Sequence, residues 1–227
     1  MKQPFDMEAF LDQTIFGLDT LAMLGDIEDF MEFSERSIDW QKQRELKRAE
    51  DGYSESQFDD PRIASQYYNQ MIDGVAYRFE VSLTQRVRYA ALTSLITTIE
   101  WVLISLKSRA TFTIPGKPGG KSEAVHLLEV FNRETALGLT SEIEAIESLV
   151  QVRNCIVHAA GLIASYKYGL ELRQRLAGFA GVKVSNINFL GDGVEIETGH
   201  LQGVVESVKT WLPNLERAMH EKGLLKR

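Results

Sequence analysis

The chain has 227 residues, of which 44% are hydrophobic, so it can bury a sizeable core and is not a disordered protein. Its formal net charge is −7, and the acidity belongs to residues 1–60, which hold 16 acidic and 6 basic residues. Residues 61–227 are mildly basic, so the overall charge does not exclude a nucleic-acid partner, and nothing in the bulk charge requires one.

The cysteine content and the length of the apolar runs indicate where in the cell the protein is expected to be. Cys155 is the single cysteine of the sequence, which excludes an internal disulfide and a cysteine-based zinc site. The first twelve residues carry three acids and no apolar run, so no signal peptide is expected. The longest strongly apolar stretch, residues 89–99, is 11 residues long, whereas a membrane span needs roughly 20. These features predict a cytoplasmic protein with no membrane segment.

The apolar pattern divides the chain into an N-terminal extension and a larger core. Helical spacing runs through residues 6–50, with a break expected at Gly25, and a polar, acidic stretch follows at residues 52–61. We therefore expect an acidic helical extension over residues 1–60 and a helical domain over residues 61–227. Within that domain, residues 82–109 carry the strongest apolar stripe. These residues would form roughly 40 Å of helix, long enough to be the spine of a bundle.

Short helices and one long loop are expected after this spine. Residues 111–121 contain two prolines and three glycines and predict a loop. Ser141 and Glu144 have the spacing of a capping box at a helix start, and Gly161 provides a stop. Helices are therefore predicted over residues 122–132, 141–160 and 162–176.

The C-terminal region predicts a β-hairpin and a final helix. Polar and apolar residues alternate on both sides of Gly191-Asp192-Gly193, which indicates a hairpin near residues 182–198 with its turn at these glycines. An amphipathic helix follows, with a kink or a break expected at Pro213. The predicted fold class is all-α: a helical bundle with a helical N-terminal extension and a small C-terminal β-hairpin.

Most familiar catalytic patterns are missing from the sequence. Residues 116–122 read G-x-x-x-G-K-S, one residue short of a phosphate-binding loop, and no strand precedes them. The four histidines include no pair at metal-ligand spacing, and no G-x-S-x-G is present. Cys155 lies mid-helix, away from any helix N-terminus that would activate it, and is expected to be a core thiol. We therefore expect no metal and no cofactor.

The helix expected over residues 141–160 places one arginine in an apolar stripe. Arg153 falls in that stripe, whereas Asn154 and His158 lie four residues apart in a neighbouring polar row. A guanidinium in an apolar stripe is unfavourable unless it is paired or lines a water-filled cleft. In one interpretation, Arg153 forms a structural ion pair with Glu100, which interrupts the apolar face of the spine. In the other, Arg153, Asn154 and His158 converge on a phosphate.

The segment Val152-Arg-Asn-Cys-Ile-Val-His158 resembles the R-x4-6-H signature of the HEPN superfamily (higher eukaryotes and prokaryotes nucleotide-binding domain). In that signature a polar residue, often asparagine, follows the arginine, as Asn154 does here. The motif also lies late in a helix of an α-helical bundle, after a long apolar helix. The resemblance covers residues 61–220 and implies a bundle of HEPN type, whereas residues 1–60 have no counterpart in it.

Many HEPN proteins are metal-independent endoribonucleases that act as homodimers, with the two motifs facing each other. The resemblance implies that Arg153 and His158 are catalytic and that Asn154 orients the site or contacts RNA. Glu100, from its place in the apolar face of the spine, is expected to support Arg153 in such a site. Histidines of the two subunits would act as base and acid, leaving a 2′,3′-cyclic phosphate. One toxin subgroup has a tyrosine two residues after the histidine, and Ala160 stands there, so this subgroup is not assigned.

The expected partners are RNA, a second copy of the chain, and an antitoxin or another regulatory protein, in a defence or toxin–antitoxin setting. Basic side chains on both sides of the motif either contact the RNA backbone or form a solvated surface; they are Lys117, Lys121, Lys167 and Arg173. The alternative function is a non-catalytic HEPN-like module for helical interaction or RNA binding. The acidic residues 1–60 would bind or shield a basic surface in either case.

Overall fold

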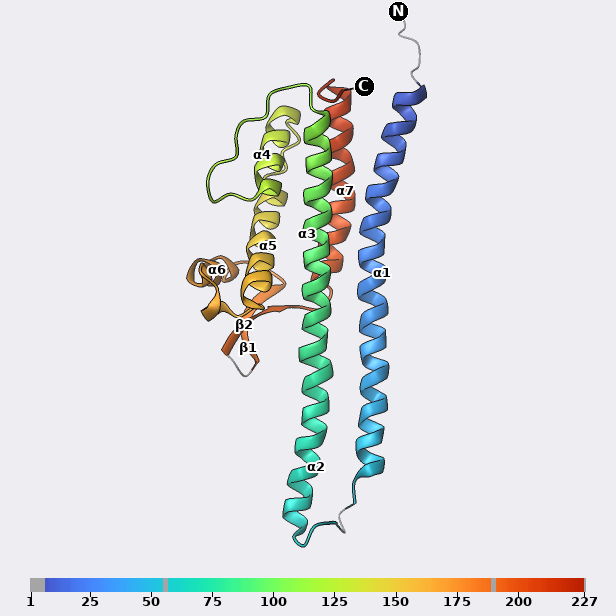
Figure 1. The fold of residues 1–227 in the computed structure, drawn as a ribbon, viewed down its shortest axis with the longest axis vertical. Coiled ribbons are helices and arrows are strands. Elements are labelled where there is room, and N and C mark those ends of the chain that lie inside the picture. The colour runs from blue at the N-terminus through green and yellow to red at the C-terminus, as the bar shows by residue number, and fades with distance from the viewer. Residues whose placement is uncertain (1–6, 55–56, 189–190, 227) are drawn as a thin grey trace, which may run out of the picture.

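The computed structural model describes residues 7–54, 57–188 and 191–226 as a helical bundle with one small β-hairpin (Figure 1). This confirms the all-α character and the position of the hairpin. The elements in chain order are α1 (Met7–Gly52), α2 (Pro61–Ala76), the π-helical segment η2 (Tyr77–Leu83), α3 (Thr84–Arg109), α4 (Glu123–Thr135), α5 (Thr140–Ala159), the 3-10 turn η3 (Ile163–Ser165), α6 (Gly169–Leu176), β1 (Val182–Asn188), β2 (Gly191–Ile196) and α7 (His200–Glu221).

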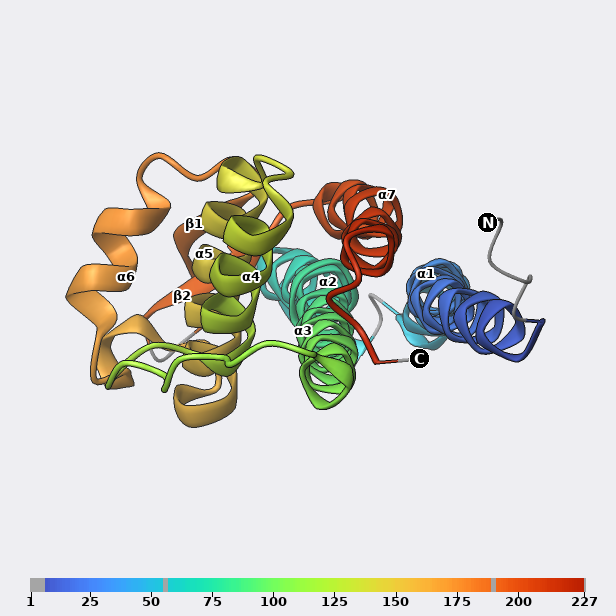
Figure 2. The same cartoon turned by 90° about the horizontal axis from the view of Figure 1, so that it is seen from above.

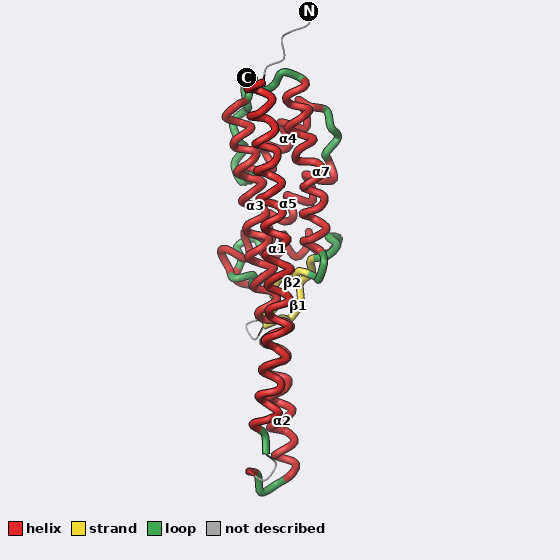
Figure 3. The backbone as a smooth tube through the Cα atoms, turned by 90° about the vertical axis from the view of Figure 1, so that its right-hand side faces the viewer, coloured by secondary structure: helices red, strands yellow, loops and turns green. Residues whose placement is uncertain are grey.

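Two long helices set the shape of the molecule. α1 has 46 residues, and α2, η2 and α3 join into one uninterrupted helical run. The C-terminal part of α1 and the whole of α2 extend beyond the remaining elements as a two-helix arm (Figures 1 and 3). The run Pro61–Arg109 contains one stretch that is long and apolar enough to cross a membrane, and half of that stretch is buried in the bundle.

The core of the bundle is built around the upper half of α3. Viewed along the bundle, α3 lies between α1 and α7 on one side and α4 and α5 on the other (Figure 2). Its apolar stripe is fully buried, as the 3.6-residue period predicts. The buried members on α3 are Ala91, Leu92, Leu95, Ile96, Ile99, Val102, Leu103 and Leu106.

The helices do not break at Gly25 or at Pro213, and one predicted helix is divided in two. α1 continues through Gly25, because Leu24 and Ile27 on either side are buried against the bundle and this packing outweighs the roughly 1 kcal/mol lost at an interior glycine. α7 continues through Pro213 without a break, since its buried apolar face holds the two halves together. The helix predicted over residues 162–176 is divided into η3 and α6 by a turn.

The capping box at the start of α5 is also absent. α5 begins at Thr140, and Leu139, which has no side-chain acceptor, occupies the N-cap position. Ser141 Oγ instead donates to Glu142 Oε2 at 2.9 Å, inside the first turn. α4, by contrast, has a side-chain cap: the N–H of Val125 donates to Ser122 Oγ at 3.2 Å.

The β-hairpin is attached to the side of α3 by two buried side chains. The amide of Gln85 pairs with Ile196 in the manner of a strand, donating to its carbonyl and accepting from its N–H, both at 3.0 Å. Arg88 donates to the same carbonyl and to Thr198 Oγ1, each at 2.7 Å. Its Nε also lies 3.2 Å from Oε1 of Glu35 on α1. Arg88 therefore links α1, α3 and the hairpin.

The turn of the hairpin differs from the prediction. β1 ends at Asn188 and β2 begins at Gly191, so Gly191 and Gly193 belong to a strand and do not form the turn. Gly193 pairs with Ser185 in an antiparallel register that shifts between Ser185 and Asn188. The remaining register brings Val184 opposite Val194, on the face that packs into the core.

Candidate functional site

Arg153 lies in the half of α5 that packs against α3, and its charge is paired. Its Nη2 donates to Oε1 of Glu100 on α3 at 3.0 Å, the partner expected from the sequence. The two side chains are 21% and 26% exposed, so water still reaches the pair at the edge of the bundle. The Arg153 Nε is buried and has no hydrogen-bond partner among the described residues. The protein therefore leaves the donors of this guanidinium only partly satisfied.

Asn154 and His158 occupy the same solvent-facing strip of α5. Asn154 is half-buried and His158 is exposed in the last turn of the helix. Val157, also exposed, lies between Arg153 and His158 around the helix. The described residues contain no hydrogen bond between Arg153 and His158. Arg153 and His158 thus lie on neighbouring faces of α5, with Val157 and Asn154 between them around the helix.

The chain that follows α5 is held tightly to the hairpin. Ala160 ends the helix in the left-handed conformation, and Gly161 continues with a φ of 82°. A Cβ at Gly161 would lie 2.6 Å from the hydroxyl of Tyr89, so only glycine permits this close approach. The N–H of Val194 donates to the carbonyl of Gly161 at 2.9 Å, and Tyr89 donates its hydroxyl proton to the carbonyl of Val194. These contacts fix the loop beside the motif.

This loop presents Lys167, which was expected to contact RNA, between two tyrosines that the sequence analysis missed. The rings of Tyr166 and Tyr168 meet edge to face with centroids 5.8 Å apart, and Lys167 Nζ lies 5.0 Å from the centroid of Tyr168. Tyr166 packs against the core, whereas Tyr168 and Lys167 are exposed. Burial, followed by the nearby Cys155, raises the pKa of the Tyr166 hydroxyl, and the positive charge of Arg153 opposes this rise.

The turn that carries these aromatic residues depends on one glycine. The N–H of Gly169 donates to the carbonyl of Tyr166 at 2.9 Å and closes the turn. A Cβ at Gly169 would lie 2.1 Å from the carbonyl oxygen of Ile163, so any other residue would displace the turn. The Tyr-Lys-Tyr sequence is a signal of nucleic-acid contact, since aromatic side chains beside basic ones can stack on bases.

The four basic residues expected to contact RNA lie in two places. Lys117 and Lys121 belong to the loop that arches beside α4 (Figure 1), where Lys121 pairs with Glu129 at 2.6 Å. They are not brought to the C-terminal end of α5. Lys167 lies in the loop beside the motif, and Arg173 lies on α6, where it pairs with Asp192 at 2.7 Å. Of the four, Lys167 is the one placed beside the candidate site.

The other nucleophilic and metal-ligating groups do not add to this site. Cys155 is fully buried, and burial raises the pKa of its thiol to about 11, so it is protonated at neutral pH. This agrees with its expected place in the core. In the described part of the chain, no three histidine, cysteine, aspartate or glutamate side chains lie close enough to hold a metal ion.

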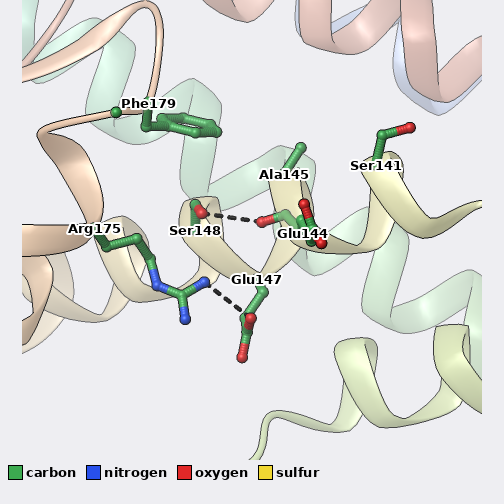
Figure 4. A pocket seen from close by; sticks show the side chains of 8 residues that line it. Ser141, Glu144, Ala145, Glu147, Ser148, Arg175 and Phe179 are labelled. Atoms are coloured by element: carbon green, nitrogen blue, oxygen red, sulfur yellow. Dashed lines mark hydrogen bonds and ion pairs between the residues drawn. The ribbon is translucent and has the colours of Figure 1, made fainter.

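A separate cavity of about 530 Å³ opens between the N-terminal half of α5 and α6 (Figure 4). Arg175 reaches across it to Glu147, with Nη1 2.9 Å from Oε2. Ser148 Oγ is satisfied by the carbonyl of Glu144 on its own helix, at 2.9 Å. The charged side chains of Arg175 and Glu147 are thus paired across the cavity, and Arg153 and His158 are not among its lining residues.

Comparison with protein-family models, with curated proteins and with solved structures found no match to this chain.

Proposed function

We propose that this protein is a metal-independent endoribonuclease of HEPN type, acting in a defence or toxin–antitoxin setting. The observation that supports it most is that α5 carries a half-buried Arg153 with incompletely satisfied donors and, in the neighbouring solvent-facing strip, an exposed His158. Asn154 lies on the same strip, and Lys167 and Tyr168 lie in the adjoining loop. This set offers an imidazole that can transfer a proton, a fixed positive charge and a surface for an unpaired base.

The reaction is a transesterification within the RNA strand. His158 of one subunit accepts the proton of a ribose 2′-OH, and the 2′ oxygen forms a bond to the adjacent phosphorus. The bond between phosphorus and the 5′ oxygen breaks, and a second histidine, His158 of the other subunit, protonates that oxygen. The products are a 2′,3′-cyclic phosphate and a 5′-OH end. The guanidinium of Arg153 stabilises the extra negative charge on the phosphoryl oxygens.

A second copy is part of this proposal because one strand needs both a base and an acid. The surface around the Arg153–Glu100 pair is rich in apolar side chains: Trp101 and Ile104 on α3 and Val157 on α5 are all exposed. Exposed apolar groups around a polar centre are typical of interface cores. Burying this surface between two copies would bring their α5 helices, and both His158 side chains, into one cleft.

Replacing His158 by alanine tests the proposal. Single-stranded RNA incubated with the wild-type protein in EDTA should be cut to fragments ending in 2′,3′-cyclic phosphate. The variant should lose roughly 10²- to 10⁴-fold in rate, because general acid–base catalysis contributes that much. His220→Ala removes another exposed histidine, on α7, and should leave the rate unchanged.

Both variants should melt within about 1 °C of the wild type, since surface substitutions change stability little. Cleavage that persists in a clean preparation of the His158 variant would rule out the assignment. Wild-type protein that cuts no RNA under any condition would do the same.

Tyr168 gives a second prediction at the level of binding. Replacing Tyr168 by alanine should weaken binding of single-stranded RNA by roughly 1–3 kcal/mol, the usual loss for one stacked base. Fluorescence anisotropy with a labelled oligonucleotide and His158→Ala protein measures this without cleavage. Tyr67→Ala, on the distant arm, is the matched control, because Tyr67 is also an exposed tyrosine. Equal affinities of the two tyrosine variants would remove Tyr168 from the RNA surface.

The second candidate function is a non-catalytic helical interaction module, and the Arg153–Glu100 ion pair favours it. In that case Arg153 serves the fold, and its replacement by alanine lowers the melting temperature by several degrees, as expected for a broken half-buried pair. RNA would then remain intact in every condition. Measuring melting and cleavage on the same Arg153 variant separates the two functions.

A further inference from the structure

α1 has apolar side chains on two opposite faces. The inner face packs against the bundle and buries Thr20, Leu24, Ile27 and Met31, spaced three or four residues apart. The outer face carries Leu18, Phe33 and Trp40, which are 60%, 77% and 58% exposed. At 100° per residue these three fall within about 60° of one another and opposite the inner face. A helix that is apolar on two faces is expected to be covered on both.

The arm formed by α1 and α2 has almost no core of its own. Over the described residues 32–54 and 57–78, Ala64 is the single buried residue. Helices derive most of their stability from tertiary packing of an apolar face, and isolated helical segments are marginal in water. The exposed apolar side chains of the arm also include Ile63 and Tyr67 on α2. This arm therefore needs a covering surface that one copy of the chain does not supply.

The charges of α1 indicate what covers it. Residues 17–34 hold five acids and no base, whereas residues 35–48 hold five bases and three acids. Two copies of α1 lying antiparallel would set the acidic half of each against the basic half of the other. A two-fold axis near Phe30 and Phe33 places Asp19 opposite Arg44 of the second copy. The exposed ion pairs that these bases now make within α1 contribute little and can exchange partners.

We propose that the outer face of α1 is the docking surface for a second copy of this chain, paired antiparallel through Leu18, Phe33 and Trp40. Such a contact is isologous, so by itself it joins two copies and closes as a dimer. α1 lies on the side of α3 that faces away from α5 (Figures 1 and 2), so this contact leaves Arg153 and His158 open. The pairing does not depend on the proposed ribonuclease activity.

Two charge-swapped variants of the full chain test the pairing. The first replaces three outer-face acids by lysine (Asp19→Lys, Asp26→Lys and Asp29→Lys), and the second replaces three outer-face bases by glutamate (Arg36→Glu, Arg44→Glu and Lys47→Glu). Each variant alone sets like charges against each other and should weaken self-association on the order of 100-fold. Mixed together, the two variants have complementary halves, so they should associate with each other as the wild type does with itself.

Sedimentation equilibrium gives the mass of each assembly. The wild-type mass should be halved in either variant and recovered in the equimolar mixture, whether or not the α3–α5 face also pairs copies. A control with the same charge change on other helices, Glu144→Lys, Glu171→Lys and Glu221→Lys, should keep the wild-type mass. Phe33→Glu, at the most exposed apolar position of the outer face, should halve the mass without lowering the melting temperature.

A monomeric wild type would overturn the proposal. The proposal would also be overturned if either charge-swapped variant kept the mass of the wild-type assembly. The same holds if an equimolar mixture of the two variants did not regain that mass. These experiments measure only the mass of the assembly and not RNA cleavage. A failure of the proposed contact can therefore be distinguished from a failure of the proposed ribonuclease activity.

Discussion

Replacing Arg88 by alanine is expected to lower the free energy of unfolding by roughly 3–5 kcal/mol, as seen when one member of a buried charged network is removed. Arg88 is almost fully buried and donates to the carbonyl of Ile196, to the hydroxyl of Thr198 and to the carboxylate of Glu35. Without the guanidinium, the Glu35 carboxylate loses its counter-charge and a space opens between α1, α3 and the hairpin. Thermal unfolding should shift by roughly 10 °C for a protein of this size.

Arg86→Ala is the matched control for this prediction. Arg86 lies two residues earlier and is exposed, so its removal should change stability by no more than about 0.5 kcal/mol. Circular dichroism at 222 nm and a urea titration measure both variants. If the two alanine variants unfold at the same urea concentration, Arg88 does not hold the hairpin and α1 to the spine.

Replacing Arg153 by lysine is expected to reduce RNA cleavage by roughly 10²- to 10³-fold, with a change in stability of less than about 1 kcal/mol. Lysine keeps the positive charge that faces Glu100, at a site where both side chains are reached by water. It lacks the planar guanidinium fork that binds two phosphoryl oxygens at once. The rate should therefore fall while the fold is retained, and single-turnover cleavage beside a melting curve shows both.

Arg175→Lys tests whether this loss is specific. Arg175 also forms a half-exposed ion pair, with Glu147, but it lies at the cavity between α5 and α6 and not beside His158. Its replacement should leave cleavage within about twofold of the wild type. An Arg153→Lys protein that cuts RNA at the wild-type rate would show that this side chain serves only the ion pair.

Strong apolar periodicity predicted the helical elements well, and local signals predicted their ends poorly. The spine, the loop at residues 111–121 and the hairpin near residues 182–198 were all located from the sequence. The sequence predicts that a helix breaks at Gly25 and that the final helix kinks or breaks at Pro213, because each residue weakens an isolated helix. Both lie in helices whose neighbouring turns are buried against the bundle, and such tertiary packing does not register in a local pattern.

The part of the candidate site that lies on helices was predicted from the sequence, whereas the part that lies in the loop after α5 was not. The ion pair of Arg153 with Glu100 followed from two charges that interrupt two apolar stripes, because packed helices must satisfy such charges together. Tyr166 and Tyr168 come beside the motif only because the carbonyl of Gly161 pairs with β2 and because Gly169 closes a turn. The first is a contact between distant parts of the chain and the second is a local turn, and no periodicity in the sequence encodes either of them.

The joint at residues 52–61 was also located from composition. Its position in the fold, and the packing of the helix that precedes it, were not predicted. It was expected to separate an extension from a core, whereas α1 packs along α3 and α7 and the joint forms the end of the arm. Gln85 and Arg88, which bind the hairpin, stand among the apolar residues of the spine with no signal of their partners. The apolar periodicity of a sequence predicts where a helix lies, but it does not predict which other elements that helix packs against.

The π-helical segment η2 sits where the arm leaves the bundle, and it determines which way the arm faces. A π turn accommodates about one residue more than an α turn, so every residue of α2 is rotated relative to the apolar stripe of α3. Deleting one residue between Tyr77 and Leu83 would let this turn close as a regular α-helical turn, so the arm would keep nearly its present direction. The same deletion in the regular part of α2 or α3 would instead turn all residues beyond it by about 100°, so η2 is the place in this long helical run where a change of one residue in length is absorbed.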